Sequence, residues 1–254
     1  MHSILITGCS SGIGHTVAHG LAREGWRVFA SARAEADVAR LRAEGLSDAL
    51  QLDVDDSVSI ERALAQVLAA TGGTLDALFN NAGFGQPGAA EDISRAALRA
   101  QFETNLFGAW ELTARVLPVM RAQGHGRVLF NSSVLGFAAM RWRGAYNASK
   151  YAMEGLADTL RLELAGSNIH VSLIEPGPIT SRFRPNALAK FRAHVDWTHS
   201  VYTEVYRAQI ERMEKPGPAA PFTLPAEAVL DAVRRALNAR RPAANLPENL
   251  TMVD

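Results

Sequence analysis

Several features that would narrow the function are scarce or missing in this sequence of 254 residues. Cys9 is the only cysteine, so the chain can form neither an internal disulfide nor a cysteine-rich zinc site. Lysine and arginine together number 26, as do aspartate and glutamate, so net charge points to neither nucleic acid nor an anionic membrane. No apolar run approaches the roughly 18 residues of a membrane helix. We therefore predict no nucleic-acid partner and no integral membrane span.

The N-terminal sequence and the histidines add two further negative expectations. The first residues, MHSILITGCSSG, lack the basic leader of a secretory signal, and we predict a cytoplasmic protein. His15 and His19 have the spacing of a helical metal pair, but the adjacent sequence offers no glutamate and no third ligand. The sequence therefore predicts no metal site.

Strand and helix patterns alternate along most of the chain. The first apolar run, residues 3–7, stops at a glycine-rich turn and is followed by a helical pattern. Further strand patterns lie at 27–31, 49–53, 75–80, 127–131 and 170–175, with a weak one at 243–246. Helical patterns lie at 35–44, 56–70, 94–122, 144–165 and 225–240. This order predicts an α/β fold: a Rossmann-type, doubly wound parallel sheet in three α/β/α layers.

One long segment interrupts this alternation. Residues 178–225 show no strand pattern and carry several aromatic side chains and a proline-rich end. Long insertions in compact domains are often lids or binding elements. We predict that residues 1–254 form a single domain in which residues 178–225 are a helical substrate lid.

The turn after the first strand has the composition of a phosphate-binding loop. It reads Gly8-Cys-Ser-Ser-Gly12-Ile-Gly14 and leads directly into a helix. Glycines let the backbone approach a pyrophosphate, whose charge is stabilised by the unpaired N–H groups of a helix N-terminus. A flexible turn that merely happens to be rich in glycine is the alternative.

Tyr146 and Lys150 form a second candidate site. At a spacing of four residues, the phenol and the ammonium lie on one face of a helix. A free tyrosine titrates near ~10, and a neighbouring cation lowers that pKa by stabilising the phenolate. The pair can therefore act as a proton donor and acceptor, whereas an exposed pair without function is the alternative for an isolated match.

Six motifs in order give the sequence a family resemblance. The glycine loop Thr7–Gly14, Asn80-Asn81-Ala82-Gly83, Asn105, Ser133, the Tyr146–Lys150 pair and Pro176-Gly177 resemble the motifs of the short-chain dehydrogenase/reductases. Ser133 lies thirteen residues before Tyr146, as the family spaces them. Within the family, the sequence looks most like hydroxysteroid- and retinol-dehydrogenase-like enzymes and bacterial aldehyde reductases. The resemblance implies an oxidoreductase that interconverts a carbonyl and an alcohol.

The resemblance also implies roles for individual residues. Tyr146 would exchange a proton with the substrate oxygen while a hydride moves to or from a nicotinamide. Lys150 would lower the pKa of Tyr146 and bind the ribose, and Ser133 would polarise the carbonyl. Asn105 would hold a water that links Lys150 to solvent, or it would bond to a neighbouring strand, and both can hold. The implied cofactor contacts are Gly8, Ser10, Ser11, Gly12, Ile13, Gly14, Arg33, Asp53, Val54, Asn81, Ala82, Gly83, Tyr146, Lys150, Pro176, Gly177, Ile179 and Ser181.

The residue after the second strand favours one cofactor. An acidic side chain there binds the ribose 2′-hydroxyl of NAD, whereas arginine attracts the 2′-phosphate of NADP. The sequence reads Ser31-Ala32-Arg33, with no carboxylate before Glu35. We predict NADP(H) with Arg33 as the phosphate ligand, with NAD(H) as the alternative. Many NADP-preferring relatives also have a basic residue where this chain has Ser11. The family as a whole usually has threonine at the position of Ser181.

The substrate is predicted from apolar residues around the proposed site. Phe84, Leu135, Phe137, Met140 and Trp142 would line the reacting end together with the aromatic lid, which suits a lipophilic ketone, aldehyde or alcohol. The same side chains could instead be ordinary core or contact residues.

The resemblance implies a homodimer or homotetramer formed through the helices at 94–122 and 144–165. The rival functions are a dinucleotide-sensing regulator without catalysis and a nucleotide-sugar epimerase or dehydratase.

Overall fold

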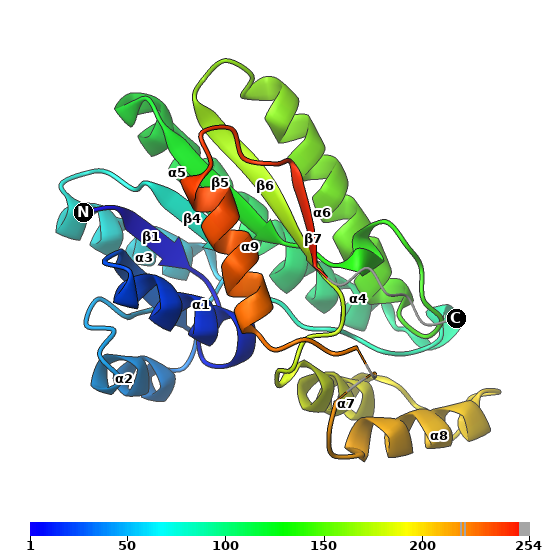
Figure 1. Ribbon diagram of the computed structural model, residues 1–254. Helices are drawn as coiled ribbons and strands as arrows, with labels where there is room; N and C mark the ends of the chain where they lie inside the picture. Colours follow the sequence, from blue (N-terminus) through cyan, green and yellow to red (C-terminus); the bar gives the residue numbers. More distant parts are fainter. Residues whose placement is uncertain (219, 221, 249–254) are drawn as a thin grey trace.

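The computed structural model describes residues 1–218, 220 and 222–248. A parallel sheet of seven strands, in the order β3-β2-β1-β4-β5-β6-β7, forms the centre of the described chain (Figure 1). The strands are β1 (Ser3–Ile6), β2 (Arg27–Ala32), β3 (Leu50–Gln51), β4 (Ala77–Asn80), β5 (Gly126–Asn131), β6 (Ile169–Pro176) and β7 (Asn245–Glu248). Their buried apolar runs are typical of a sheet that is covered on both faces.

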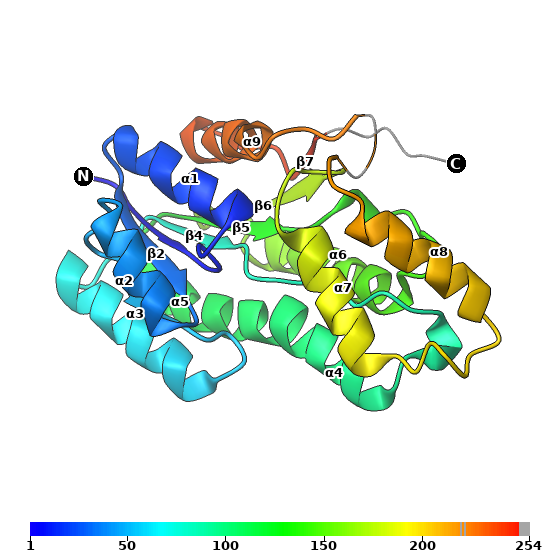
Figure 2. The same ribbon diagram turned by 90° about the horizontal axis from the view of Figure 1, so that it is seen from below.

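Helices cover the two faces of the sheet, as Figure 2 shows from below. One face carries α1 (Gly12–Arg23), α2 (Glu35–Ala43) and α9 (Glu227–Asn238). The other carries α3 (Ser57–Thr71), α5 (Gly108–Gln123) and α6 (Gly144–Glu163). Each face has its own buried apolar cluster against the sheet. The predicted three-layer, doubly wound α/β fold is confirmed.

The strand order reverses between β1 and β4. From β1 the chain proceeds to β2 and β3 on one side, and β4 returns to pair with the other side of β1. Ile6 at the end of β1 is in register with Phe79 near the end of β4. The loops that follow these two strands therefore begin at the same edge, where doubly wound folds bind their ligands.

Two boundaries differ from the sequence-based expectation. The single helix expected at 94–122 consists of α4 (Arg95–Phe102), a π-helical segment (Glu103–Phe107) and α5. Such segments insert one extra residue into a helix and often occur at functional sites. The last strand begins at Asn245 rather than at residue 243, because Leu246 pairs with Ile174 and is buried against the sheet.

The segment after β6 forms a small helical layer beyond the carboxyl ends of the strands (Figures 1 and 2). It contains α7 (Phe183–His194) and α8 (Thr203–Glu214). Phe191 and Tyr206 are buried between these helices, with ring centroids 5.0 Å apart. An isolated β-bridge between Ile179 and Leu224 ties the two ends of the segment together. Within the described residues, no helix combines the length and hydropathy needed to cross a bilayer.

Candidate active site

The glycine loop packs directly against the loop that follows β4. Gly8 has a φ of 73°, and a Cβ there would lie 2.9 Å from the Cα of Ala82. A Cβ on Gly14 would collide with the Gly8 carbonyl oxygen and with the side chain of Asn81. Glycine is therefore required at both positions by close packing, as well as by the left-handed backbone at Gly8.

The first turn of α1 carries no acidic side chain of its own. Ser11 is the N-cap residue but makes no capping hydrogen bond through its side chain, and the first turn, Gly12 to His15, contains no acidic residue. The first N–H groups of this helix, including those of Gly12 and Ile13, are available to a ligand. The carbonyl of Ser10 accepts a hydrogen bond of 2.7 Å from Arg40, which holds the loop against α2. Together with the close-packed glycines, this geometry fits a pyrophosphate group.

Thr7 organises the contact between the two loops. Its Oγ1 accepts hydrogen bonds of 2.9 Å from the backbone N–H groups of Asn81 and Ala82. The Asn81 side chain donates to the Thr7 carbonyl at 2.8 Å and accepts from Asn131 at 2.9 Å. Asn81 thus links the glycine loop, the loop after β4 and the end of β5. Thr7 and Asn131 were absent from the predicted cofactor contacts, and only the folded geometry reveals their bridging role.

The residues expected around the adenosine half lie along the same edge. Arg33 directly follows β2 and is exposed, and within the described part of the chain no hydrogen bond or salt bridge engages its guanidinium. Asp53 is half-buried after β3, where its Oδ1 accepts from the N–H of Asp55 at 3.1 Å. Val54 is buried, and its carbonyl lies close against Gly108 on α5. The Arg33 charge therefore remains available to a ligand.

Tyr146 lies in the first turn of α6 and is 8% exposed. The ring of Phe183, the first residue of α7, packs edge-on against it with centroids 5.4 Å apart. Burial raises the pKa of Tyr146 to about 12, while a hydrogen bond with Ser133 and the charge of Arg143 act to lower it. Ser133 is the N-cap residue of a short 3-10 turn, Val134–Gly136. Ser133 thus lies near enough to the Tyr146 hydroxyl to act on its pKa.

Lys150 is almost fully buried one turn further along α6. Its Nζ donates a hydrogen bond of 2.6 Å to the Asn131 carbonyl and lies 5.7 Å from the centroid of the Tyr146 ring. Burial lowers the pKa of Lys150 to about 8, and Glu154 acts to raise it. The charge that acts to lower the Tyr146 pKa here is that of Arg143, so the effect of Lys150 on this pKa stays a prediction.

Asn105 is fully buried in the π-helical segment, and both the oxygen and the nitrogen of its carboxamide form hydrogen bonds. Its Oδ1 accepts from the N–H of Phe84 at 3.0 Å, and its Nδ2 donates to the Phe84 carbonyl at 3.0 Å and to Ser149 at 3.1 Å. Gly83 lies beside it, since a Cβ on Gly83 would be 3.1 Å from Oδ1. Asn105 therefore bonds to the loop after β4, close to the alternative that its sequence position suggested.

The chain after β6 closes the site from the other side. Ser133 Oγ donates to the carbonyl of Pro176 at 3.4 Å, and the N–H of Gly177 donates to the carbonyl of Glu248 at 2.7 Å. Ile179 packs against the core on the α1 side of the sheet. Ser181 lies against the glycine loop, because a Cβ on Gly12 would be 3.0 Å from the Cβ of Ser181. The residues expected on both sides of a nicotinamide dinucleotide thus lie at the carboxyl edge of the sheet.

The apolar side chains expected at the reacting end divide into two groups. Trp142 packs on Tyr202, with centroids 4.9 Å apart, and belongs to the core of the helical layer. Phe137 and Met140 are nearly half exposed, whereas Phe84 and Leu135 are partly buried. Most lid aromatics therefore stabilise the lid itself, whereas Phe183 packs on Tyr146.

Two carboxyl groups near the site, Glu154 and Glu175, were not predicted from the sequence. Glu154 on α6 hydrogen-bonds the hydroxyl of Ser132, and burial raises its pKa to about 7. Glu175 on β6 is 2% exposed, accepts from Asn245 at 2.5 Å, and also has a pKa raised by burial. The two side chains come from positions 21 residues apart in sequence, and no short motif links them.

This carboxyl pair predicts a pH dependence of stability. The pKa of Glu154 is higher in the folded state than in the unfolded chain, so the folded state binds more protons between these two values. We expect the free energy of unfolding to fall as pH rises from about 5 to about 7, and Glu154→Gln to flatten that decline. Urea unfolding across this range measures it, with Glu163→Gln on the exposed end of α6 as the control. An equally steep decline in both variants would contradict the assignment.

Comparison with known sequences gives one clear family. The sequence model described as short chain dehydrogenase matches residues 2–190. The uncharacterized oxidoreductase YbbO of Escherichia coli strain K12 is 45% identical over 249 residues, which cover 98% of this chain and 86% of that protein. Human retinol dehydrogenase 8 is 39% identical over 197 residues, which cover 74% of this chain and 62% of that protein.

Solved structures agree with the fold. A variant of actinorhodin polyketide ketoreductase with NADPH superposes with a TM-score of 0.79 at 28% identity, covering 97% of this chain and 95% of that one. A short chain dehydrogenase/reductase from Burkholderia phymatum in complex with NAD gives a TM-score of 0.80 at 25% identity, covering 96% and 88%. The two neighbours thus differ in the cofactor that they contain.

Proposed function

The chain belongs to the short-chain dehydrogenase/reductase family of NAD(P)(H) oxidoreductases, and from this we propose that it interconverts a lipophilic ketone or aldehyde and the corresponding alcohol with NADP(H). One observation carries the proposal: Ser133, Tyr146 and Lys150 converge at the crevice edge that the glycine loop borders. A regulator without catalysis would have no need to bury a phenol and an ammonium side by side.

Tyr146 is the proposed acid and base. In the reducing direction its hydroxyl donates a proton to the substrate oxygen, and in the oxidising direction the phenolate removes it. Ser133, which lies near enough to the phenol to act on its pKa, would donate to the same oxygen and polarise the carbonyl. A nearby ammonium on Lys150 favours the phenolate at the moment when the proton has left. Phe183 excludes water from this point by covering the Tyr146 ring.

The cofactor is proposed to lie along the crevice from β2 to β6. Gly8 to Gly14 and the N-terminus of α1 would hold the pyrophosphate, and Lys150 would bind the nicotinamide ribose. Asp53 and Val54 would flank the adenine, with the loop Asn81–Gly83 and the segment from Pro176 to Ser181 beside the nicotinamide. When bound, the nicotinamide supplies the hydride chemistry that no side chain can perform.

Arg33 is the proposed determinant of cofactor choice. Arg33→Ala should raise the KM for NADPH by about 10- to 100-fold, because a hydrogen bond to a charged group contributes about 1.5–3 kcal/mol. The KM for NADH should change less than about twofold. Steady-state kinetics with both cofactors measures this, and Arg99→Ala on the exposed side of α4 is the charge-matched control. Equal effects on the two cofactors would remove Arg33 as the phosphate ligand.

The lipophilic substrate class rests on apolar surroundings and on relatives. Phe183 packs on the Tyr146 ring. Phe84 and Leu135 are partly buried and lie in the segments that follow β4 and β5. One relative is named a retinol dehydrogenase, which acts on an apolar alcohol by its name. We propose that residues 178–225 act as the lid over this substrate.

A panel of apolar and polar aldehydes, ketones and alcohols tests the proposal, with turnover measured through the absorbance of the cofactor. Cofactor binding without turnover of any of them would argue for a regulator.

Self-association is proposed through the helices that the family resemblance suggests. Leu98, Phe107, Tyr151 and Leu162 lie on α4, the π-helical segment and α6, and each is at least 39% exposed. Several large apolar side chains on neighbouring helices favour a contact with a second copy. Sedimentation analysis that finds only monomer at micromolar concentration would rule this contact out.

A further inference from the structure

The two histidines that the sequence left without a third ligand acquire one from a neighbouring helix. His15 and His19 lie one turn apart on α1, and Glu44 follows the last residue of α2. His15 Nε2 lies 2.7 Å and His19 Nε2 lies 3.0 Å from the same carboxylate oxygen, Glu44 Oε2. We propose that His15, His19 and Glu44 form a binding site for a divalent transition-metal ion such as Zn²⁺.

The distances need little adjustment for a metal ion. Three candidate ligand atoms, one from each residue, lie within 4.8 Å of one another. Tetrahedral zinc, with bonds of about 2.0–2.2 Å, separates its ligand atoms by about 3.3 Å. The two nitrogen–oxygen distances must therefore grow by about 0.3–0.6 Å, which small side-chain rotations achieve. Three protein ligands also leave a fourth position for water.

A hydrogen bond from Arg40 already orients the carboxylate of Glu44 for metal binding. Its other oxygen, Oε1, accepts a hydrogen bond of 3.0 Å from Arg40, which also bonds Asp37 at 2.8 Å. A hydrogen bond of this kind holds a ligating carboxylate in place and leaves its second oxygen free for the metal. A glutamate carboxyl titrates near ~4.3, so this ligand is ionised at neutral pH. The positive charge of Arg40 opposes a bound cation, which limits the affinity.

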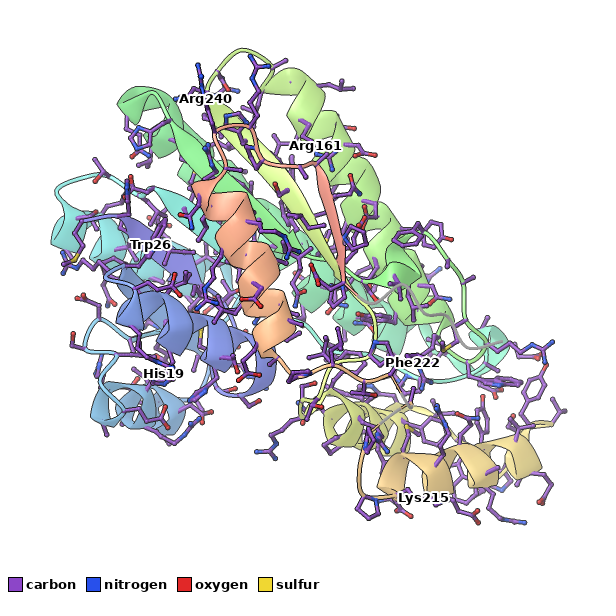
Figure 3. The ribbon with its side chains drawn as sticks, viewed as in Figure 1. His19, Trp26, Arg161, Lys215, Phe222 and Arg240 are labelled. Atoms are coloured by element: carbon purple, nitrogen blue, oxygen red, sulfur yellow. The ribbon has the colours of Figure 1, made fainter. Side chains whose placement is uncertain are left out.

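The site is accessible and selective in its chemistry. The side chains of His15, His19 and Glu44 are 32%, 21% and 31% exposed, so an ion can enter from solvent. Figure 3 labels His19 where α1 faces α2. Two imidazole ligands favour Zn²⁺, Ni²⁺ or Cu²⁺ over Mg²⁺ and Ca²⁺, which prefer oxygen ligands. The competing interpretation is a hydrogen-bonded cluster that binds no metal.

Titration of the full-length, tag-free protein after treatment with a chelator tests the proposal. Calorimetry with ZnCl₂ should show one saturable equivalent, and MgCl₂ should show none. Loss of one ligand, in His19→Ala or Glu44→Gln, should weaken Zn²⁺ binding at least tenfold, since even outer-shell changes cost about 10- to 100-fold. Co²⁺ should give the visible absorption of a low-symmetry site in the wild type and lose it in both variants.

A histidine elsewhere on the surface provides the matched control. His125 pairs with Asp76 at 3.0 Å at the other end of the sheet, where β5 begins. His125→Ala should leave Zn²⁺ binding unchanged, and all variants should unfold near the wild-type temperature in the presence of chelator. Absence of saturable Zn²⁺ binding to the wild type, or equal loss in His125→Ala, would overturn the proposal. Neither result would bear on the oxidoreductase activity.

Discussion

Replacing Tyr146 with phenylalanine is expected to lower kcat by about 1,000-fold while NADPH binding changes little. General acid–base catalysis by one positioned side chain contributes about 10²–10⁴-fold, and the variant removes the only hydroxyl of that residue. Phenylalanine retains the ring that packs on Phe183, so the fold and the lid contact should survive. Initial rates with an active carbonyl substrate and cofactor titration measure the two effects separately.

Tyr151 on the same helix provides the matched control for this prediction. Its side chain is 46% exposed, and Tyr151→Phe should leave both kcat and the cofactor affinity within about twofold of the wild type. If Tyr146→Phe retained most of its turnover, the proton would have to come from another group, and Ser133 would be the next candidate. A variant that also lost NADPH binding would instead point to a disturbed crevice.

Local patterns were sufficient to predict the sheet and its order of helices. Each buried strand appears as a short apolar run, and helical segments lie between successive strands, so the parallel arrangement follows from chain order. The short strand β3 and the position of β7 were predicted less well. The limits of β7 depend on pairing partners such as Ile174 for Leu246, which lies more than 70 residues away.

The side chains of the site could be named from sequence, but their electrostatics could not. The family resemblance implied that Ser133 acts beside Tyr146, and the structure places Ser133 near enough to the phenol to act on its pKa. The raised pKa of Tyr146 depends on its burial in the folded chain, where one of its neighbours, Phe183, belongs to the long segment after β6. The same limitation hid the third ligand of His15 and His19, because Glu44 reaches them through tertiary packing of α1 on α2.

The π-helical turn around Asn105 shows how fold and site depend on one another. Asn105→Ala is expected to lower the free energy of unfolding by about 2–3 kcal/mol, because it leaves the N–H of Phe84 without its partner in a buried loop. The Phe84 carbonyl keeps a hydrogen bond of 2.8 Å from Gln101, which limits the loss. Urea unfolding measures the change, with Asn186→Ala on the exposed face of α7 expected to stay within about 0.5 kcal/mol of the wild type.

The same substitution should also reduce turnover under conditions where the protein remains folded. Asn105 donates to Ser149, whose hydroxyl bonds the backbone carbonyl of Tyr146 at 2.8 Å. Without Asn105, the loop after β4 and the first turns of α6 lose their common anchor, so the phenol is held less accurately. We expect kcat to fall about tenfold with an almost unchanged KM for NADPH. A variant as stable and as active as the wild type would show that the π-helical turn does not position the phenol.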